Sequence, residues 1–314
     1  MHINKFFKKK CLFLMGPTAC GKSKFVIYLR KYLPIEIISV DSALIYRDMN
    51  IGTDKPNDFY LLHHPHSLLN IKDPSESYSA AEFRKDALNE IKKIIKIGKI
   101  PCLVGGTMFY YQVLLYGLSN LPASNIKIRQ ILLDKNRNKK NFLHEQLSFI
   151  DPISASRIHK NDHQRLLRAL EVFYISGKTL TDLKKNIFSK FPYGVIQFCM
   201  MPPSQIWLYE KIEERIKNMF FLGFQKEVEN LFFRGDLHKN LPSIKSIGYR
   251  QMWEYLEYKT TYNEMFYKII FATRKLVKHQ LTWLKKWKNI HYLNSSLSHH
   301  ILLKKILNLL NQKY

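Results

Sequence analysis

Short, mostly apolar runs alternate with longer amphipathic segments along the first third of the chain. Residues 11–15, 35–42 and 101–107 are predicted to be strands, because each run is short and is bounded by polar or glycine-containing segments. The segment "SYSAAEFRKDALNEIKKIIKIGKI" has helical spacing, and Ser77 and Ser79 are candidate N-caps at its start. Strands that alternate with helices predict an α/β fold with a doubly wound parallel sheet.

The pattern changes between residues 120 and 195, where strand-like runs disappear and helical stretches such as "IRQILLDKNRNKKNFLHEQLSFI" take their place. The stretch "FPYGVIQFCMMP", residues 191–202, is again typical of a strand, and helical segments follow it toward the C-terminus. We therefore expect residues 1–119 and 196–314 to form the α/β core with C-terminal helices. Residues 120–195 are expected to form a helical insertion domain.

Composition adds a strong positive charge to this picture. The 314 residues include 50 Lys and Arg against 25 Asp and Glu, a formal net charge of +25. Such a surplus favours polyanionic partners, because each neutralised phosphate releases counterions. Lys, Ile, Asn, Phe and Tyr are all abundant, however, as expected of an A/T-rich coding sequence. Charge alone therefore leaves open a nucleic acid, an anionic membrane surface or no anionic partner.

Cysteine usage and hydropathy favour a cytoplasmic protein without a membrane partner. No C-x-x-C spacing occurs, so we expect no zinc site and a reduced compartment for Cys11, Cys20, Cys102 and Cys199. The apolar run 11–15 is too short for the core of a signal peptide. No stretch reaches the roughly 18 apolar residues that a membrane-spanning helix needs. The "HHPH" cluster, residues 63–66, lacks acidic or cysteine companions and is interpreted as a polar loop.

Near the N-terminus, "GPTACGKS" matches G-x-x-x-x-G-K-[ST], a loop that binds phosphates. The backbone N–H groups of such a loop lie at a helix N-terminus and bind phosphate oxygens. Gly16 and Gly21 allow close approach, Lys22 supplies a positive charge, and the Ser23 hydroxyl can bind Mg²⁺. The motif follows a predicted strand and opens a predicted helix, which makes it specific. It predicts a P-loop-type sheet and a phosphate site formed by Gly16, Pro17, Thr18, Ala19, Cys20, Gly21, Lys22 and Ser23.

Ligands of doubly wound sheets bind beyond the carboxyl ends of the strands. Gly16, Asp41 and Thr107 all follow predicted strands and are therefore expected to meet in one crevice. A carboxylate beside bound phosphates suits a metal ligand or a general base, but Asp41 could equally cap the turn "DSAL". The loop alone also fits a small-molecule kinase that uses ATP. A basic RNA-binding module with an inactive loop is another hypothesis.

Further motifs follow the phosphate loop along the chain: "ISVDSALIYRDMNIGTDKP", "PHSLLNIKDPSESYSAAEFRKDAL", "PCLVGGTMFYYQVLLYGLSNLP", "DPISASRIHKNDHQRLLRALEVFYISGKTLT", "RGDLHKNLPSIKSIGYRQMW" and "ATRKLVKHQLTWLKKW". On these motifs and their order, the sequence resembles the bacterial tRNA dimethylallyltransferases, also called tRNA isopentenyl transferases. The resemblance covers nearly the whole chain, apart from about a dozen residues at each end.

The resemblance implies a reaction and its participants. The family transfers a dimethylallyl group from dimethylallyl diphosphate to the exocyclic amine of the adenosine 3′ of the anticodon in tRNA, and releases diphosphate. Residues 18–23 would line the diphosphate, with Mg²⁺ near Ser23. Asp41 matches the family's general base, Thr107 a threonine near the reacting centre, and Arg215 an arginine that grips the diphosphate. The expected partners are dimethylallyl diphosphate and the tRNA anticodon stem-loop, and a monomer is expected.

The resemblance also implies an RNA surface, at which a flipped adenine packs against aromatic or apolar side chains. Tyr249 and Trp283 can stack on bases, although a core position is the preferred interpretation for Trp283. Leu166 and Leu167 could also belong to the hydrophobic core. The implied tRNA-binding residues are Asp41, Ser42, Ala43, Leu44, Thr107, Arg129, Gln164, Arg165, Leu166, Leu167, Arg168, Lys245, Ser246, Ile247, Gly248, Tyr249, Arg250, Lys278, His279, Gln280, Leu281, Thr282, Trp283, Leu284 and Lys285.

Overall fold

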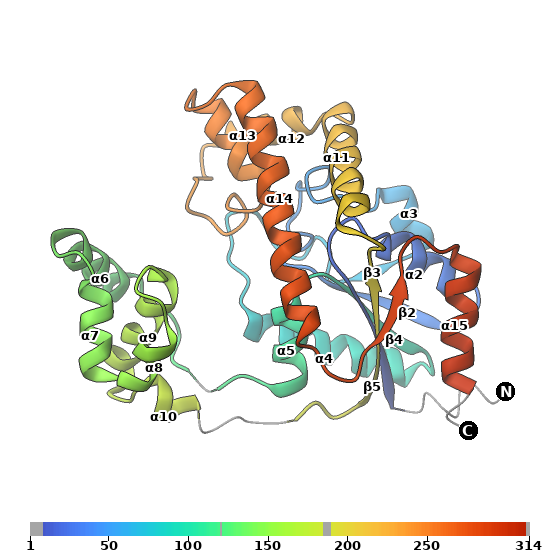
Figure 1. Cartoon of the computed structure of the whole chain (residues 1–314), viewed down its shortest axis with the longest axis horizontal. Coiled ribbons are helices and arrows are strands. Elements are labelled where there is room, and N and C mark those ends of the chain that lie inside the picture. The colour runs from blue at the N-terminus through green and yellow to red at the C-terminus, as the bar shows by residue number, and fades with distance from the viewer. Residues whose placement is uncertain (1–8, 120, 185–189, 312–314) are drawn as a thin grey trace. The chain divides into compact units, whose positions relative to one another are not determined.

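The computed structural model describes residues 9–119, 121–184 and 190–311 (Figure 1). The chain folds into two compact units. One is formed by Met1–Leu114 together with Tyr193–Tyr314, and the other by Leu115–Pro192. The helical insertion was expected at residues 120–195. The observed helical unit begins and ends a few residues earlier, at Leu115 and Pro192.

The first unit is built around one parallel sheet of six strands, in the order β3-β2-β4-β1-β5-β6. The strands are β1 (Lys10–Met15), β2 (Ile35–Val40), β3 (His66–Ser67), β4 (Ile100–Gly105), β5 (Gly194–Met201) and β6 (His291–Asn294). The four strands predicted from apolar runs correspond to β1, β2, β4 and β5. The expected doubly wound α/β fold is therefore confirmed. The two edge strands, β3 and β6, are short and have no apolar run that predicts them.

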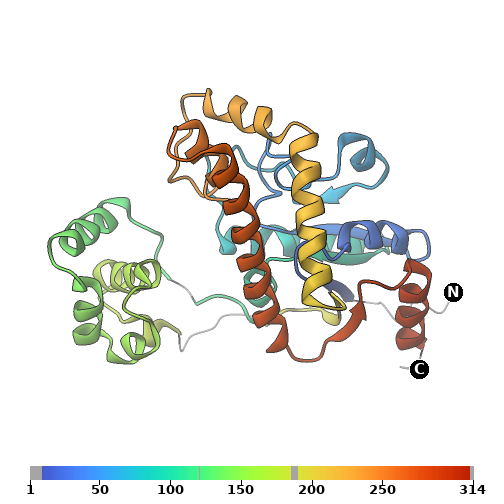
Figure 2. The same cartoon turned by 45° about the horizontal axis from the view of Figure 1, so that its top comes forward.

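Helices of this unit cover the sheet and extend beyond it (Figures 1 and 2). They are α2 (Lys22–Arg30), α3 (Asp58–His63), α4 (Ala80–Lys96), α5 (Met108–Tyr116), α11 (Gln205–Phe221), α12 (Phe224–Phe232), α13 (Tyr249–Leu256), α14 (Tyr262–Lys285) and α15 (His299–Asn311). Ser79 caps α4 through reciprocal hydrogen bonds with Glu82, which confirms one of the two candidate N-caps. In both views α11 and α14 lie side by side.

The central strand β1 is buried on both faces of the sheet. Leu12 and Leu14 belong to the larger hydrophobic core, to which α2 contributes Phe25. The intervening Phe13 lies on the other face, with its ring centroid 5.0 Å from that of Tyr111 in α5. Since side chains alternate along a strand, helices must cover both faces, which explains the almost continuous apolar sequence of β1.

The second unit consists mainly of helices around a small core of its own. The helices are α6 (Ile126–Asn138), α7 (Phe142–Ile150), α8 (Pro152–Arg157), α9 (His163–Ser176) and α10 (Leu180–Lys184). Leucines from α6, α7 and α9 fill the core, among them Leu132, Leu143, Leu147, Leu166 and Leu170. Across the described parts of both units, we find no helix that combines the length and the apolar character needed to cross a membrane.

Candidate active site

A cavity of about 500 Å³ lies beyond the carboxyl ends of β1, β2 and β4. Its polar lining includes Thr18 after β1, Asp41 after β2 and Thr107 after β4, together with Arg215 of α11. The convergence follows from the parallel sheet, because the carboxyl ends of parallel strands reach the same edge. A volume of this size suits a ligand of small-molecule dimensions.

The phosphate loop connects β1 to α2 through a backbone that few residues can adopt. Gly16 has no room for a side chain, because a Cβ atom there would lie 2.6 Å from the carbonyl oxygen of Met200. Ala19 and Gly21 both have left-handed backbone angles, with φ values of 68° and 76°. Helix α2 begins at Lys22, so its first backbone N–H groups lie at the loop. This geometry is that of an anion-binding loop.

Lys22 places a cation inside the loop. Its Nζ donates a hydrogen bond to the carbonyl oxygen of Pro17 at 2.7 Å. Burial lowers the pKa of the Lys22 ammonium, whereas the nearby Cys20 and Asp41 oppose this shift. A desolvated cation that is bonded to a neutral carbonyl is suited to bind an incoming anion. A hydrogen bond to an anion is stronger than its present bond to the carbonyl oxygen.

Asp41 is oriented by the turn that follows β2. Its Oδ1 accepts hydrogen bonds from the N–H groups of Ala43 and Leu44, at 2.8 and 3.3 Å. The capping alternative for Asp41 is therefore correct. It is also compatible with a second role, because within the described ranges no hydrogen bond involves Oδ2. The turn fixes one carboxylate oxygen and leaves the other available to a ligand in the cavity.

Thr107 links the ends of β2 and β4. Its Oγ1 accepts a hydrogen bond from the Ser42 N–H at 3.2 Å, and its own N–H donates to the Val40 carbonyl at 3.3 Å. Gly105 permits this close approach, since a Cβ atom there would lie 2.0 Å from the same Val40 oxygen. Because Oγ1 acts as an acceptor toward Ser42, the hydroxyl proton can be donated to a ligand in the cavity.

Arg215 reaches the cavity from α11 and is held by a neighbouring turn. Its Nη2 donates to the carbonyl oxygen of Thr53 at 3.1 Å, and its Nη1 lies 3.4 Å from Oδ2 of Asp54. The guanidinium has further N–H groups beyond these two contacts. It can therefore bind an anion in the cavity without giving up its anchor on the turn.

A carboxylate that sequence reasoning missed holds this turn in place. Glu227 of α12 accepts three hydrogen bonds, from the N–H groups of Asn50, Ile51 and Gly52. It accepts a fourth from the hydroxyl of Tyr249 at 2.6 Å. The three N–H donors lie 175–177 residues away in the sequence, so no local pattern could have revealed this role.

Replacing Gly52 with Ala is expected to destabilise the protein by roughly 1–3 kcal/mol through overpacking. The added Cβ would lie 2.3 Å from the ring of Phe224 and 2.6 Å from that of Tyr249, and both rings are buried. Thermal unfolding measures the loss. Gly194→Ala is the matched control, because its Cβ would meet only the flexible side chain of Lys10, at 3.0 Å. Equal melting temperatures for Gly52→Ala and wild type would contradict this packing.

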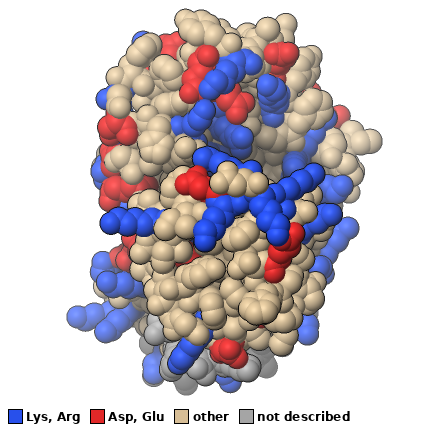
Figure 3. Space-filling view, turned by 90° about the vertical axis from the view of Figure 1, so that its left-hand side faces the viewer, with Lys and Arg blue, Asp and Glu red and all other residues tan. Residues whose placement is uncertain are grey.

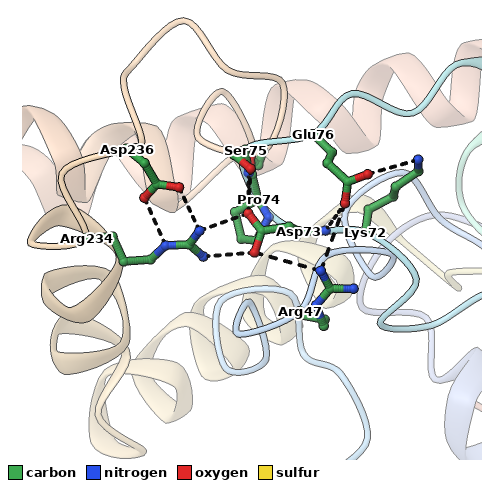
Figure 4. Close-up of polar contacts among 9 residues, drawn as sticks. Arg47, Lys72, Asp73, Pro74, Ser75, Glu76, Arg234 and Asp236 are labelled. Atoms are coloured by element: carbon green, nitrogen blue, oxygen red, sulfur yellow. Dashed lines mark hydrogen bonds and ion pairs between the residues drawn. The ribbon is translucent and has the colours of Figure 1, made fainter.

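An ionic network fixes the connection between α12 and α13 (Figure 4). Arg234 donates from Nη1 and Nη2 to the carboxylate of Asp73, at 3.2 and 2.9 Å. The Arg234 guanidinium lowers the pKa of the Asp73 carboxyl well below its usual range. Ser243 adds a buried hydrogen bond to the carbonyl oxygen of Pro74. These contacts anchor the segment that contributes Lys245 to the cavity lining.

The implied tRNA-binding residues divide into accessible and buried positions. Lys and Arg side chains are accessible on each of the two units, and Figure 3 shows some of them in blue. Accessible or partly accessible residues are Asp41, Ser42, Ala43, Leu44, Thr107, Arg129, Gln164, Arg165, Arg168, Lys245, Ser246, Ile247, Arg250, Lys278, His279, Leu281, Thr282, Trp283 and Lys285. The buried ones are Leu166, Leu167, Gly248, Tyr249, Gln280 and Leu284, and of these six only Gln280 lines the cavity.

Burial corrects several of the expected roles. Leu166 and Leu167 belong to the core of the helical unit, so the core alternative is correct for both. Tyr249 cannot stack on an RNA base, because its ring is buried and its hydroxyl donates to Glu227. Trp283, by contrast, is 37% exposed and lines the cavity, so its interpretation as core is wrong. A contiguous helical stretch always includes inward-facing positions, which is why these assignments failed.

In the helical unit, a buried carboxylate orients two of the implied RNA-binding arginines. Glu171 accepts hydrogen bonds from Nε and Nη2 of Arg129, at 2.8 and 3.0 Å. It also accepts from Nη1 of Arg168 at 2.6 Å and from the N–H of Asn125 at 2.7 Å. The Glu171 side chain is fully buried, whereas both guanidinium groups remain partly exposed. The cluster keeps a net positive charge at the surface of the unit.

Replacing Glu171 with Gln is expected to destabilise the protein by about 1–3 kcal/mol at neutral pH, because two arginines lose a charged acceptor. Burial alone would raise the pKa of Glu171, but Arg129, Arg168 and Asn125 lower it overall. The wild-type carboxylate therefore stabilises the fold above the ordinary Glu pKa of about 4.5 and loses this effect as the pH falls through the lowered value. Thermal unfolding at a series of pH values measures both effects.

The difference in melting temperature between Glu171→Gln and wild type should shrink on acidification. Glu145→Gln is the matched control, since Glu145 pairs with Lys139 at an exposed position and surface pairs contribute little. A difference that stays constant from neutral to acid pH would contradict the assigned role of Glu171.

The donor set for a metal is sparse. The described residues contain no group of three or more His, Cys, Asp or Glu side chains that could hold a metal ion. Ser23 is exposed in the first turn of α2, beside the phosphate loop. Mg²⁺ commonly binds through few protein ligands and completes its shell with substrate phosphates and water. Ser23 therefore fits a metal ion that arrives with a phosphorylated ligand.

The fold and the cavity define a phosphate-loop α/β protein whose cavity joins an anion-binding loop to an oriented carboxylate. The sequence pattern of the IPP transferase family matches residues 44–287. This match spans most of the 314 residues, and the chain belongs to the IPP transferase family.

Known proteins of similar sequence and structure agree with this assignment. The chain is 67% identical over 309 residues to the tRNA dimethylallyltransferase of Buchnera aphidicola subsp. Acyrthosiphon pisum (strain APS), covering 98% of both chains. It is similar to the crystal structure of a tRNA isopentenylpyrophosphate transferase from Bacillus halodurans, with 32% identity, a TM-score of 0.72 and coverage of 98% and 97%. A eukaryotic dimethylallyltransferase acting on tRNA is similar with 26% identity and a TM-score of 0.78, over 91% of this chain and 74% of that one.

Proposed function

We propose that this enzyme transfers a dimethylallyl group from dimethylallyl diphosphate to the exocyclic amine of the adenosine 3′ of the anticodon in tRNA, and releases diphosphate. The observation that carries the proposal is the cavity that joins the phosphate loop to the Asp41 carboxylate. Membership of the IPP transferase family and the names of the similar proteins support it. The two substrates of the proposed reaction need an anion site and a proton acceptor within one small volume.

The donor would bind with its diphosphate on the loop and its five-carbon chain in the cavity. Lys22, Arg215 and the loop N–H groups would neutralise the charge that grows on the leaving diphosphate. Mg²⁺, held by Ser23 and the diphosphate, would add to this neutralisation. Apolar side chains in the lining would contact the prenyl chain, namely Met108, Ile216, Met219, Ile269 and Leu276.

The acceptor adenine must leave its base stack to reach the cavity. The allylic carbon–oxygen bond breaks as the carbon–nitrogen bond to the amine forms, and the diphosphate leaves with the bonding electron pair. The amine then loses a proton, which Oδ2 of Asp41 would accept because Oδ1 is held by the turn. Trp283 and His279 line the cavity and would contact the flipped base.

A small-molecule kinase that uses ATP is the alternative, and it is not favoured. Family membership points to prenyl transfer rather than phosphate transfer. The apolar lining of the cavity suits a hydrocarbon chain better than a polyhydroxylated acceptor. A basic RNA-binding module with an inactive loop would leave the oriented carboxylate of Asp41 without a role.

Transfer of label from dimethylallyl diphosphate to tRNA tests the proposed function. Purified protein is incubated with radiolabelled dimethylallyl diphosphate, Mg²⁺ and unmodified tRNA, and we expect the label in the tRNA. The same tRNA with guanosine in place of the target adenosine is the control and should remain unlabelled. Absence of label from both tRNAs, with consumption of ATP in the presence of a small hydroxyl acceptor, would establish the kinase instead.

We also propose that the enzyme acts as a monomer in the cytoplasm. All four cysteines are free and buried, which suits a reduced compartment. Thr18 of the phosphate loop, Arg215 and the proposed proton acceptor Asp41 line one cavity within a single chain, so a second subunit is not required. Light scattering during size-exclusion chromatography gives the mass in solution. A dimer that persists at nanomolar concentration would contradict the monomer.

A further inference from the structure

Gln280 of α14 connects two segments of the active site through its side-chain amide. Its Oε1 accepts a hydrogen bond from the N–H of Thr18 at 3.0 Å, and its Nε2 donates to the carbonyl oxygen of Gly106 at 2.9 Å. The Thr18 N–H can only donate and the Gly106 carbonyl oxygen can only accept, so the orientation of the Gln280 amide is determined. Gln280 is 8% exposed and lines the cavity.

The two bonds join segments that are distant in the sequence. Thr18 belongs to the phosphate loop after β1, and Gly106 precedes Thr107 after β4. Gln280 lies 262 and 174 residues from these partners. A Cβ atom on Gly106 would lie 2.6 Å from Nε2 of Gln280, so the glycine and the glutamine fit each other closely.

Further hydrogen bonds connect the two bonds of Gln280 to the part of the cavity that contains Asp41. Thr107 donates its N–H to Val40 and accepts at Oγ1 from the N–H of Ser42, the residue after Asp41. An unbroken series of contacts therefore runs from the phosphate loop through Gln280 to the turn that orients Asp41. We infer that Gln280 is a positioning residue, which fixes the spacing between the site of the diphosphate and the site where the adenine amine loses its proton.

This inference rests on the proposed function. It adds Gln280 as a residue that affects the reaction through the phosphate loop and the turn that contains Thr107. The role differs from that of an RNA contact, which the resemblance implies for Gln280. A contact to RNA would change the affinity for tRNA, whereas a spacer between two reacting groups changes turnover of the bound complex. Misplacement of reacting groups by about 1 Å can lower a rate by roughly 100-fold.

Gln280→Glu tests the two hydrogen bonds of Gln280, because an ionised carboxylate can only accept hydrogen bonds. It would keep the bond from Thr18 but would place an oxygen against the Gly106 carbonyl. We expect kcat for prenyl transfer to fall by about 10- to 100-fold at mildly alkaline pH, with the KM for both substrates changed much less. Protonation of the new carboxyl restores a donor toward Gly106. Activity relative to wild type should therefore recover as the pH is lowered through the raised pKa of this buried acid.

Two further variants complete the experiment. Gln280→Met has a similar length and no hydrogen bonds, so its kcat should fall without recovery at lower pH. Gln251→Glu is the matched control, because Gln251 uses its Oε1 as an acceptor from the Gly248 N–H and a carboxylate keeps that bond. Its profile of activity against pH should follow wild type.

The inference is overturned if Gln280→Met turns over like wild type, or if both Gln280 variants raise only the KM for tRNA. If Gln280→Glu does not fold, as judged by circular dichroism, the kcat of Gln280→Met decides alone. A wild-type enzyme that transfers no label to tRNA would refute the proposed function, whereas active wild type with unaffected variants would refute only the role of Gln280.

Discussion

Replacement of Asp41 by Asn is expected to lower kcat for prenyl transfer by roughly 10²- to 10⁴-fold, the usual contribution of a general base. Asn keeps an amide oxygen at the position that accepts from the N–H groups of Ala43 and Leu44, so the turn should persist. The second oxygen is replaced by the NH2 group of the amide, which donates hydrogen bonds and cannot accept the adenine proton. Single-turnover kinetics with labelled donor measure the chemical step directly.

Affinity for tRNA should be retained in Asp41→Asn, because the change removes no positive charge. Asp48→Asn is the matched control. Asp48 is an exposed carboxylate on the same connection, and its left-handed backbone, with φ of 61°, is one that Asn also adopts readily. Wild-type turnover by Asp41→Asn would remove the proposed base, whatever the result for Asp48.

Replacement of Lys22 by Ala is expected to lower kcat by about 10²- to 10³-fold and to raise the KM for dimethylallyl diphosphate. The Lys22 ammonium is desolvated and has the carbonyl oxygen of Pro17 as its partner, so an arriving diphosphate gains a strong charge-assisted contact. That contact strengthens further as the leaving group gains charge. Steady-state kinetics with varied donor concentration separate the two effects.

Inhibition by inorganic diphosphate gives an independent measure of the same contact. It should weaken in Lys22→Ala, whereas tRNA binding should change little. Lys24→Ala is the matched control, because Lys24 is exposed in the first turn of the same helix, directly after the phosphate-loop motif. Equal inhibition of wild type and Lys22→Ala by diphosphate would place the donor's phosphates elsewhere.

Local signals were sufficient for the central part of the fold. The phosphate loop, the strand before it and the helix after it are encoded within about twenty residues, and all three occur as the pattern indicates. The cap at Ser79 is similarly local, because its partner Glu82 lies three residues away. The apolar runs predicted the four longest strands, which are buried in the sheet.

The remaining features depend on contacts between distant parts of the chain. Strands β3 and β6 are defined by pairing with β2 and β5 rather than by hydrophobicity of their own. Glu227 gains its role from a turn that only the tertiary structure brings near. Resemblance assigned Tyr249 and Leu284 to an RNA surface as members of contiguous stretches. Consecutive residues of a helix point in several directions, and these two side chains are buried and do not line the cavity.

A crystal structure with a tRNA anticodon stem-loop and an unreactive thio-analogue of dimethylallyl diphosphate would show where the donor and the acceptor adenine bind. We expect the analogue's diphosphate to lie on residues 16–23. We also expect the amine of the flipped adenine to lie within about 2.6–3.2 Å of a carboxylate oxygen of Asp41. A complex with the amine far from Asp41, or with the prenyl donor bound outside the cavity, would contradict these expectations.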